Sequence, residues 1–402
     1  IFPRLSAQCK TQVANGLLLL YKQEQDPKLQ KRIGFSISTL ARYVCDKDDP
    51  RGHLAEGGWP ELLPLVFGMC VQPSSPEAGE IALRMLKELV ATLASDIVAA
   101  KQELGVILQG ALQSAELKLQ HAGLLLVCEI VCYAKKSDWA PLLATAGALV
   151  QVMRKMVASQ DENMLQEALM AITETAGAEP EFFKQLLSTS MEPATFLCEV
   201  TRQRDMPEVR GLALEWLVTY CEKRTKWLSK HLQGYFAVVL EACMVLMLEV
   251  DESEEEVAAW ARRMDDEEGD EDEDDLYHVG EEAIDRVVKS IEMEAASGPL
   301  FALIGQFVKR DEWQYKHAAL AAIKQTIEYA EEQTHIDEMG QLLLQHMGHA
   351  HPRVRYAALH ALGQLANDQS PAFQERSHAQ VMPVLSEKMD DPVDKVAAMA
   401  MS

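Results

Sequence analysis

The chain has 402 residues and a formal net charge of −24, and 48% of its residues are apolar, enough for two or three ordinary domains or one elongated array. Aromatic residues make up only 6%, Ala, Leu, Met, Glu and Gln dominate, and no strand-like Val/Ile/Thr alternation is present, so the composition favours helices and argues against a sheet. The negative charge argues against a surface that binds nucleic acid or anionic lipid and favours basic protein partners.

Along the chain, one helix-opening turn recurs. Weak copies lie near Asp26-Pro27, Ser75-Pro76, Glu116 and Asp161-Glu162. Stronger copies follow at 206–217 (MPEVRGLALEWL), 311–323 (DEWQYKHAALAAI), 351–366 (HPRVRYAALHALGQLA) and 391–401 (DPVDKVAAMAM). In the copy at 351–366, Pro352 opens a helix and the apolar residues are spaced 3, 1, 3, 1, 3, as one stripe of an amphipathic helix. That stripe consists of Val354, Ala357, Ala358, Ala361, Leu362 and Leu365.

The turns follow one another at intervals of about 39 to 49 residues, except for a longer interval from about Glu255 to Trp313. A period of roughly 40 to 47 residues with two helices per unit is typical of HEAT and armadillo repeats. The sequence therefore predicts an all-α fold: an α-solenoid of roughly eight to nine stacked HEAT repeats over residues 1–402, wound as a right-handed superhelix with a concave inner face. Arg210, Lys316, Arg355 and Lys395 follow the turns, and we expect each to reach an acidic group at the neighbouring turn.

An acidic block interrupts this pattern, and we predict that residues 251–280 form a loop inserted between the two helices of one repeat. Between Asp251 and Asp285 there are 18 acidic and two basic residues, so this segment carries −16 of the total charge. Such a segment has too little apolar content to fold alone. Helix should resume near Glu281, with Ile284, Val287, Val288 and Ile291 as its apolar stripe, and Trp260 and Trp313 could anchor the ends of the insertion.

Two interpretations of the block remain open: a solvated loop that aids solubility, and an electrostatic contact for a basic partner. We favour the second because the charge is concentrated in one turn. An EF-hand calcium loop that starts at Asp270 fails, since Asp275 stands where that loop needs Gly. The candidate partner-binding residues are Asp265, Asp266, Glu267, Glu268, Asp270, Glu271, Asp272, Glu273, Asp274 and Asp275.

The sequence offers little chemistry beyond this block. Phosphate-binding glycine loops, HExxH and GxSxG are absent, so we predict no enzyme activity, no cofactor and no metal site. We expect His346, His349 and His351 to be solvated turn residues, the eight cysteines to be reduced and buried, and Cys128 and Cys132 to share a packed helix face. The longest apolar tract, Ala237–Val250, has 14 residues with Glu241 and Glu249 among them, too short for a membrane span of roughly 20.

Three stretches resemble the importin-β superfamily of nuclear transport receptors, most of all its importin beta-3 branch. They are VGEEAIDR (Val279–Arg286), DEWQYKHAAL (Asp311–Leu320) and HPRVRYAALHALGQLANDQSPAFQ (His351–Gln374). The likeness is specific from Val279 to Gln374 and looser before Ala237, and IFPRLSAQCKTQV at the start resembles the second repeat of such a receptor. Because the chain does not begin with Met and stops inside a helical pattern, we expect it to be a piece of a longer protein that lacks the family's first repeat and C-terminal half.

The resemblance implies a monomeric nuclear import receptor that shuttles between cytoplasm and nucleus. Such a receptor binds basic cargo, for example ribosomal proteins or histones, on its concave face and docks to Phe-Gly nucleoporins. Ran in its GTP form then releases the cargo. In relatives the acidic loop touches cargo or Ran, and that role carries over to Asp265–Asp275 only. The alternative function is a HEAT scaffold subunit of another intracellular complex, such as a phosphatase scaffold, whose repeats would be more regular and would lack a long acidic insertion.

Overall fold

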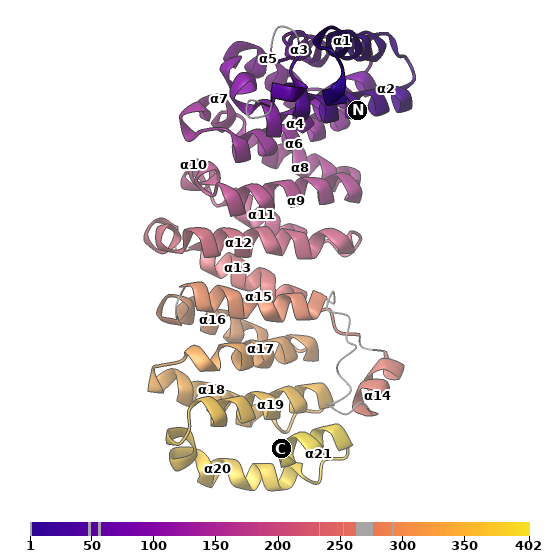
Figure 1. Cartoon of the computed structure of the whole chain (residues 1–402). Helices are drawn as coiled ribbons and strands as arrows, with labels where there is room; N and C mark the ends of the chain where they lie inside the picture. Colours follow the sequence, from indigo (N-terminus) through magenta and orange to yellow (C-terminus); the bar gives the residue numbers. More distant parts are fainter. Residues whose placement is uncertain are drawn as a thin grey trace. The chain divides into compact units, whose positions relative to one another are not determined.

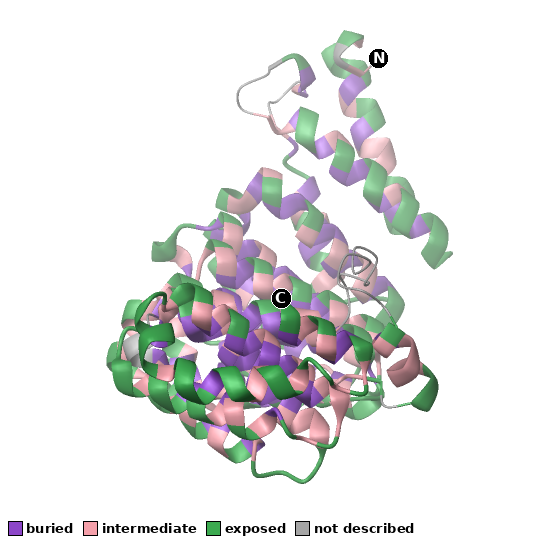
Figure 2. Ribbon diagram, turned by 90° about the horizontal axis from the view of Figure 1, so that it is seen from below, coloured by how far each residue is buried: buried purple, intermediate pink, exposed green. Residues whose placement is uncertain are grey.

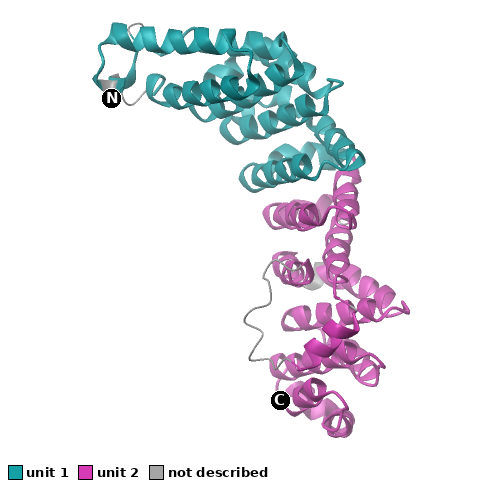
Figure 3. Cartoon of the chain, turned by 90° about the vertical axis from the view of Figure 1, so that its right-hand side faces the viewer, with its two compact units in different colours: residues 1–189 teal, residues 190–402 magenta. Residues whose placement is uncertain are grey.

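The computed structural model of the chain describes residues 2–46, 50–54, 58–232, 234–251, 253–262, 276–291 and 293–402. All regular secondary structure in these ranges is helical, as the composition predicted (Figure 1). The helices group into two compact units, residues 1–189 and 190–402, each described below by itself (Figure 3). Within the described ranges, no helix is both long enough and apolar enough to cross a membrane.

The first unit is a stack of antiparallel helix pairs in which each second helix packs against the next second helix. Short helices η1 (Phe2–Arg4), η2 (Pro50–Gly52), η3 (Lys136–Asp138), α7 (Ala140–Leu143) and α10 (Glu181–Thr189) connect or flank the pairs. The pairs are α1 (Ala7–Gln23) with α2 (Pro27–Val44), α3 (Leu62–Val71) with α4 (Pro76–Ala99), α5 (Lys101–Leu112) with α6 (Leu117–Tyr133), and α8 (Ala146–Ser159) with α9 (Glu162–Ala178).

The second unit repeats the arrangement and adds α14 (Glu254–Arg262) between the two helices of one pair. A short helix, η5 (Ile327–Tyr329), continues α17. The pairs are α11 (Glu192–Val200) with α12 (Pro207–His231), α13 (Gly234–Leu246) with α15 (Leu276–Ile291), α16 (Met293–Phe307) with α17 (Trp313–Thr326), α18 (Gln333–His346) with α19 (Pro352–Asp368), and α20 (Ala372–Lys388) with α21 (Asp394–Met401). We call the continuous surface of α12, α15, α17, α19 and α21 the second-helix row.

The recurring turn opens a helix at every predicted position, and each of these helices is the second of its pair; the second helix α15, which follows the acidic block, has no copy of the turn. In the weak copies, Asp26, Ser75 and Asp161 cap α2, α4 and α9, because their side chains accept hydrogen bonds from backbone N–H groups in the first turn. Pro27, Pro76, Pro207 and Pro352 stand at the first helical position, where a proline loses no hydrogen bond. The turn therefore fixes where each of these second helices begins.

Burial of the second helices confirms the apolar stripes. All six predicted residues of α19 and all four of α15 are buried. A single pair could not bury such stripes, and consecutive second helices bury them against one another. Buried residues accordingly lie where helices face each other, and exposed residues lie on the outer surfaces (Figure 2). The prediction of one array over residues 1–402 stays a prediction, since each unit forms a stack of its own.

Candidate partner-binding surface

The acidic block belongs to the second unit, between α14 and α15. Its ten predicted partner-binding carboxylates, Asp265 to Asp275, lie outside the described residues, so their role stays a prediction. The flanks correct the predicted loop at 251–280, because this range contains all of α14 and the first turn of α15. Helix resumes at Leu276 rather than near Glu281, and the reason is packing: Leu276 and Val279, in the first turn of α15, lie over Gly211 of α12.

Trp260 anchors α14 to the second-helix row. It is 8% exposed and is the buried residue of α14, in which residues 256–259 and 261 are half-buried. Its ring meets Tyr356 of α19 edge to face, with 5.5 Å between centroids, and α14 also contacts α21. The predicted anchoring of one end of the insertion by Trp260 is thus confirmed, and α14 lies beside α19 and α21 although it follows α13 in the chain (Figure 1). The helix that precedes the block in the sequence therefore lies next to this row.

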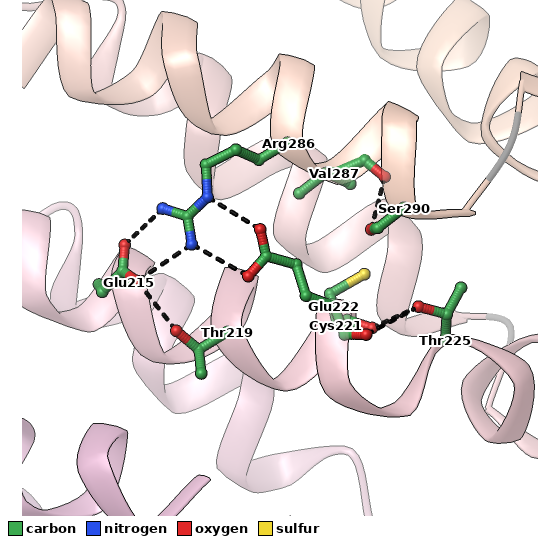
Figure 4. A network of polar contacts seen from close by, with 8 residues as sticks. All are labelled: Glu215, Thr219, Cys221, Glu222, Thr225, Arg286, Val287 and Ser290. Carbon is green, nitrogen blue, oxygen red and sulfur yellow. Dashed lines mark hydrogen bonds and ion pairs between the residues drawn. The ribbon is translucent and has the colours of Figure 1, made fainter. Parts of the chain in front are cut away.

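A guanidinium joins two carboxylates across α12 and α15 (Figure 4). Arg286 donates to Glu215 at 2.7 and 3.1 Å and to Glu222 at 2.9 and 3.1 Å. Hydrogen bonds to these two carboxylates raise the pKa of Arg286, so it remains charged. Glu215 and Glu222 lie seven residues apart on α12 and therefore on one helix face. The cluster has a net charge of −1 and is partly exposed, so it adds a negative patch to the row.

Glu281 makes a second polar link, from α15 to α17. Its carboxylate lies 2.8 Å from the ammonium of Lys324 and 3.6 Å from the ring of His278. Burial alone would raise the pKa of Glu281, but hydrogen bonds from His278 and Lys324 outweigh burial and lower it to about 2. Beside this link, Tyr329 donates to Asp285 at 2.6 Å. Glu281 is therefore ionised at neutral pH, and its contacts link α15 to α17 within the second-helix row.

Stacked rings continue the row from α15 through α17 to α19. His317 lies between Tyr277 (5.3 Å between centroids) and Trp313 (6.1 Å), and Trp313 stacks on His351 at 3.8 Å with nearly parallel planes. Burial lowers the pKa of His317 to about 3 and that of His351 to about 4, so both rings are neutral at pH 7. The expectation that His351 is a solvated turn residue was therefore wrong, because the residue is half-buried and its ring packs on Trp313.

The rings of the other two histidines of the turn, His349 and His346, contact backbone groups. The His349 ring accepts from the His351 N–H at 3.0 Å, and His346 contacts the Leu342 carbonyl at 2.8 Å. Within the part of the chain that the structure describes, no group of three or more His, Cys, Asp or Glu could hold a metal ion.

The four basic residues after the turns make three kinds of contact within the fold. Arg210 reaches Glu249 at 2.7 Å and Arg355 binds Asp391 with two bonds of 2.7 Å, which confirms the predicted link to the neighbouring turn. Lys316 instead donates to the carbonyls of its own turn. Lys395 is only 2% exposed and its ammonium lies 5.4 and 5.3 Å from the rings of Trp260 and Tyr356. The pattern therefore predicts the position of all four cations, and the predicted acidic partner for Arg210 and Arg355.

The first unit carries a groove of about 340 Å³ over α4, α6 and α9. Two exposed apolar residues, Tyr133 and Met170, lie on its wall beside acidic Glu129 and Glu174. Cys128 and Cys132 also line it, and burial raises the pKa of the Cys128 thiol to about 12, as expected for a packed face. Not every cysteine is buried as predicted, however: Cys9 is exposed on α1 because its side chain lies on the solvent side of that helix.

Family models of importins and of HEAT repeats match segments of both units. A family model described as "IPO5-like, TPR repeats" matches residues 25–192, one described as "Importin repeat" matches residues 204–295, and one described as "HEAT repeat" matches residues 340–369. Among curated proteins, importin subunit beta-3 of Saccharomyces cerevisiae is 24% identical over 385 residues, 94% of this chain. The chain spans 33% of that relative.

Solved structures of Kap121p share the fold. Kap121p bound to Nup53p superposes with a TM-score of 0.83 and Kap121p bound to Pho4p with a TM-score of 0.82. In both, 22% of residues are identical, 99% of this chain is covered, and the match takes up 37% of the other chain. The predicted solenoid of stacked HEAT repeats is confirmed by these matches.

Proposed function

This chain belongs to the importin-β superfamily, and from that premise we propose that it is part of a nuclear import receptor. In this proposal the receptor binds basic cargo proteins through its second helices, docks to Phe-Gly nucleoporins and releases cargo when Ran binds in its GTP form. It shuttles between cytoplasm and nucleus and acts by binding rather than by catalysis. The titles of related structures name Kap121p bound to Nup53p, Ste12p and Pho4p, which supports partners of the same kinds here.

One observation carries the proposal: in the sequence ten carboxylates follow α14, and α14 packs on a row whose partly exposed surface already bears Glu215, Glu222 and Asp285. A field of one sign concentrated in one place attracts basic segments and speeds their association. Because the cluster around Arg286 holds its carboxylates in fixed positions, it adds charge at little further ordering cost.

The test uses the full-length receptor with a basic cargo tail and with Ran loaded with either GTP or GDP. We expect Ran-GTP to bind and displace the cargo, and Ran-GDP to do neither. Equal binding of the two nucleotide states, or none, would remove Ran-controlled release from the proposal.

The acidic block has its own test. Neutralising Asp265–Asp275 should weaken cargo or Ran binding at low salt and flatten the dependence of affinity on salt, since exposed charges are screened within about 10 Å at 0.1 M salt. A matched control neutralises exposed carboxylates of the first unit, Glu77, Glu103 and Glu116, and should leave the salt dependence as it was. An unchanged slope in the block variant would return the block to a solubility role.

A further inference from the structure

The groove over α4, α6 and α9 in the first unit has the form of a pocket for one long side chain. Its volume of about 340 Å³ is at the lower end of the range of about 300 to 1,000 Å³ that ligand pockets occupy. Its walls carry the exposed side chains of Tyr133, at the end of α6, and Met170, on α9. Cys132 and Thr175 meet at 3.8 Å between the two helices, so the floor consists of small side chains.

Five charged side chains also line the groove, and four of them are engaged in ion pairs with one another. Arg84 joins Glu167 at 3.2 Å, and Lys87 joins Glu129 at 3.4 Å. Glu174 is the fifth: it is exposed, and it has no ion pair within the described part of the chain. Since the four paired charges cancel, the lining residues have a net charge of −1, and this charge lies on Glu174.

The two walls of the groove have the same design. On α9, Glu174 follows Met170 by four residues, and on α6, Tyr133 follows Glu129 by four residues, so each wall pairs one carboxylate with one apolar side chain. Burial raises the pKa of the Cys132 thiol, and the negative charges of Glu174 and Glu129 add to the rise. Both carboxylates therefore lie near this thiol at the floor of the groove.

Such a groove suits the side chain of an arginine or a lysine. The aliphatic stem of that side chain can lie along Met170 while its cationic end reaches a carboxylate. The face of the Tyr133 ring attracts a cation as well. An acidic side chain would be repelled by Glu174, and a neutral one would leave its charge without a partner.

We propose that this groove is a binding subsite for one arginine or lysine of a basic partner segment, with Glu174, Tyr133 and Met170 as its contacts. We call these three residues and Glu129 the cation groove. The proposal rests on the function proposed above in one respect, that basic proteins bind to the second helices. It adds to that function a contact point on the first unit, at a place where the sequence shows no concentration of acidic residues.

The probe is a fluorescein-labelled peptide, GSGRRRRGSG, titrated by anisotropy at low salt into the chain with Asp265–Asp275 neutralised. In this background the acidic block does not attract the peptide, so failure of the groove and failure of the block are separate results. We expect Glu174→Gln to weaken binding about threefold to fivefold, because it removes the unpaired carboxylate. Glu103→Gln, which removes an exposed carboxylate from α5, is the matched control and should leave the affinity unchanged.

The aromatic wall has its own pair of variants. Tyr133→Leu stays apolar but removes the ring, and we expect it to weaken peptide binding about twofold to fivefold. Tyr133→Phe retains the ring and should bind as the parent does. Equal affinities of the Leu and Phe variants would remove Tyr133 from the cation groove.

Photo-cross-linking gives a second readout that needs no change in the groove. A benzophenone placed beside the central arginines of the peptide should label α4, α6 or α9, as mapped by mass spectrometry. A peptide with citrulline in place of arginine, which keeps the shape but not the charge, should give neither labelling nor anisotropy. The proposal is overturned if Glu174→Gln and Glu103→Gln change the affinity equally, if the citrulline peptide binds as well, or if the cross-links map only to other helices.

Discussion

Arg355 and Asp391 form a two-pronged ion pair that joins α19 to the turn before α21. Nε and Nη2 of Arg355 each lie 2.7 Å from one carboxylate oxygen, and the side chains are 10% and 3% exposed. The remaining guanidinium nitrogen donates to the carbonyls of His349 and Ala350 at 2.9 and 3.0 Å, and Asp391 also accepts from the Val393 N–H. Because every polar atom of the pair is satisfied, the cost of its burial is offset.

Removing one partner should therefore be costly. Arg355→Met leaves Asp391 buried without its counter-charge, and we expect a loss of about 3 to 5 kcal/mol in the free energy of unfolding of the second unit. Urea unfolding followed by circular dichroism measures this loss. The control is Arg376→Met, whose pair with Asp337 is exposed and 3.8 Å apart, with an expected loss of about 0 to 1 kcal/mol. Similar losses for both variants would mean that the Arg355 pair is no more than a surface contact.

Glu281 makes the second unit sensitive to acid. Its pKa in the folded chain, about 2, lies below the ordinary value of 4.5. The ionised form therefore stabilises the fold fully above pH 4.5, and this stabilisation is lost as the pH falls from 4.5 towards 2. We expect about 2 to 3 kcal/mol of pH-dependent stability from this group, measured as the change in unfolding free energy between pH 6 and pH 3.

Glu281→Gln should remove that part of the pH dependence, whereas Glu282→Gln, a change to its exposed neighbour, should keep it. If the curves of the two variants coincide, Lys324 and His278 do not hold the charge of Glu281 as their distances imply.

His317 also makes the fold less stable in acid, but over a higher pH range than Glu281 does. Burial holds its pKa at about 3, whereas an unfolded histidine has a pKa near 6.5. Below pH 6.5 the unfolded chain takes up a proton that the folded chain does not, so stability falls as the pH drops from 6.5 towards 3. His317→Phe keeps a ring between Tyr277 and Trp313 and removes the buried ring nitrogen Nδ1, for which no hydrogen-bond partner is present among the described residues.

We expect His317→Phe to cost less than about 1 kcal/mol at pH 7 and to reduce the drop in Tm between pH 7 and pH 5. His378→Gln, at an exposed position on α20, is the control, and its Tm should fall between pH 7 and pH 5 by as much as that of the unaltered chain. A full drop in the His317 variant would show that other groups govern stability in this pH range.

Arg286 allows a test of charge on the second-helix row. Arg286→Gln leaves Glu215 and Glu222 on one face of α12 without their shared cation, so the local charge changes from −1 to −2. If basic cargo approaches this row, its affinity should rise by a few-fold at low salt and return to the original value at high salt. The paired change Glu215→Gln with Glu222→Gln should weaken binding. If Arg286→Gln weakens binding, or if the paired change strengthens it, the cargo binds elsewhere.

The sequence predicted much of the fold because helices and their buried stripes are local. The spacing of Val354 to Leu365 is enough to place α19 and its buried face, and the Pro and Asp residues at the turns locate the second helices. The cations after the turns were found by the same alignment of repeats, and for Arg210 and Arg355 the predicted acidic partner is present.

Contacts between distant segments could not be predicted in the same way. Nothing in the spacing around Trp260 indicates that it contacts Tyr356 and Lys395, which lie 96 and 135 residues further along the chain, because one sequence does not show which helices meet. The Arg286 cluster was missed although Glu215 and Glu222 are spaced to share a helix face, since their cation comes from α15. His351 was placed in solvent because turn histidines are usually polar surface residues, and stacking on Trp313 decided otherwise.

Gly280 tests how closely α15 packs against α13. A methyl group at this position would lie 2.6 Å from the Cys243 carbonyl oxygen and 2.9 Å from a side-chain carbon of Met247, closer than such atoms can approach. Gly280→Ala must therefore push the two helices apart, and we expect it to cost about 1 to 3 kcal/mol of stability despite the better helix propensity of alanine. Gly363→Ala on α19, where the added methyl carbon would have no neighbour within 4 Å apart from its own helix backbone, should instead stabilise by up to about 1 kcal/mol. Thermal unfolding of the two variants side by side separates propensity from packing: if both raise Tm, the approach of α15 to α13 at Gly280 is looser than the structure has it.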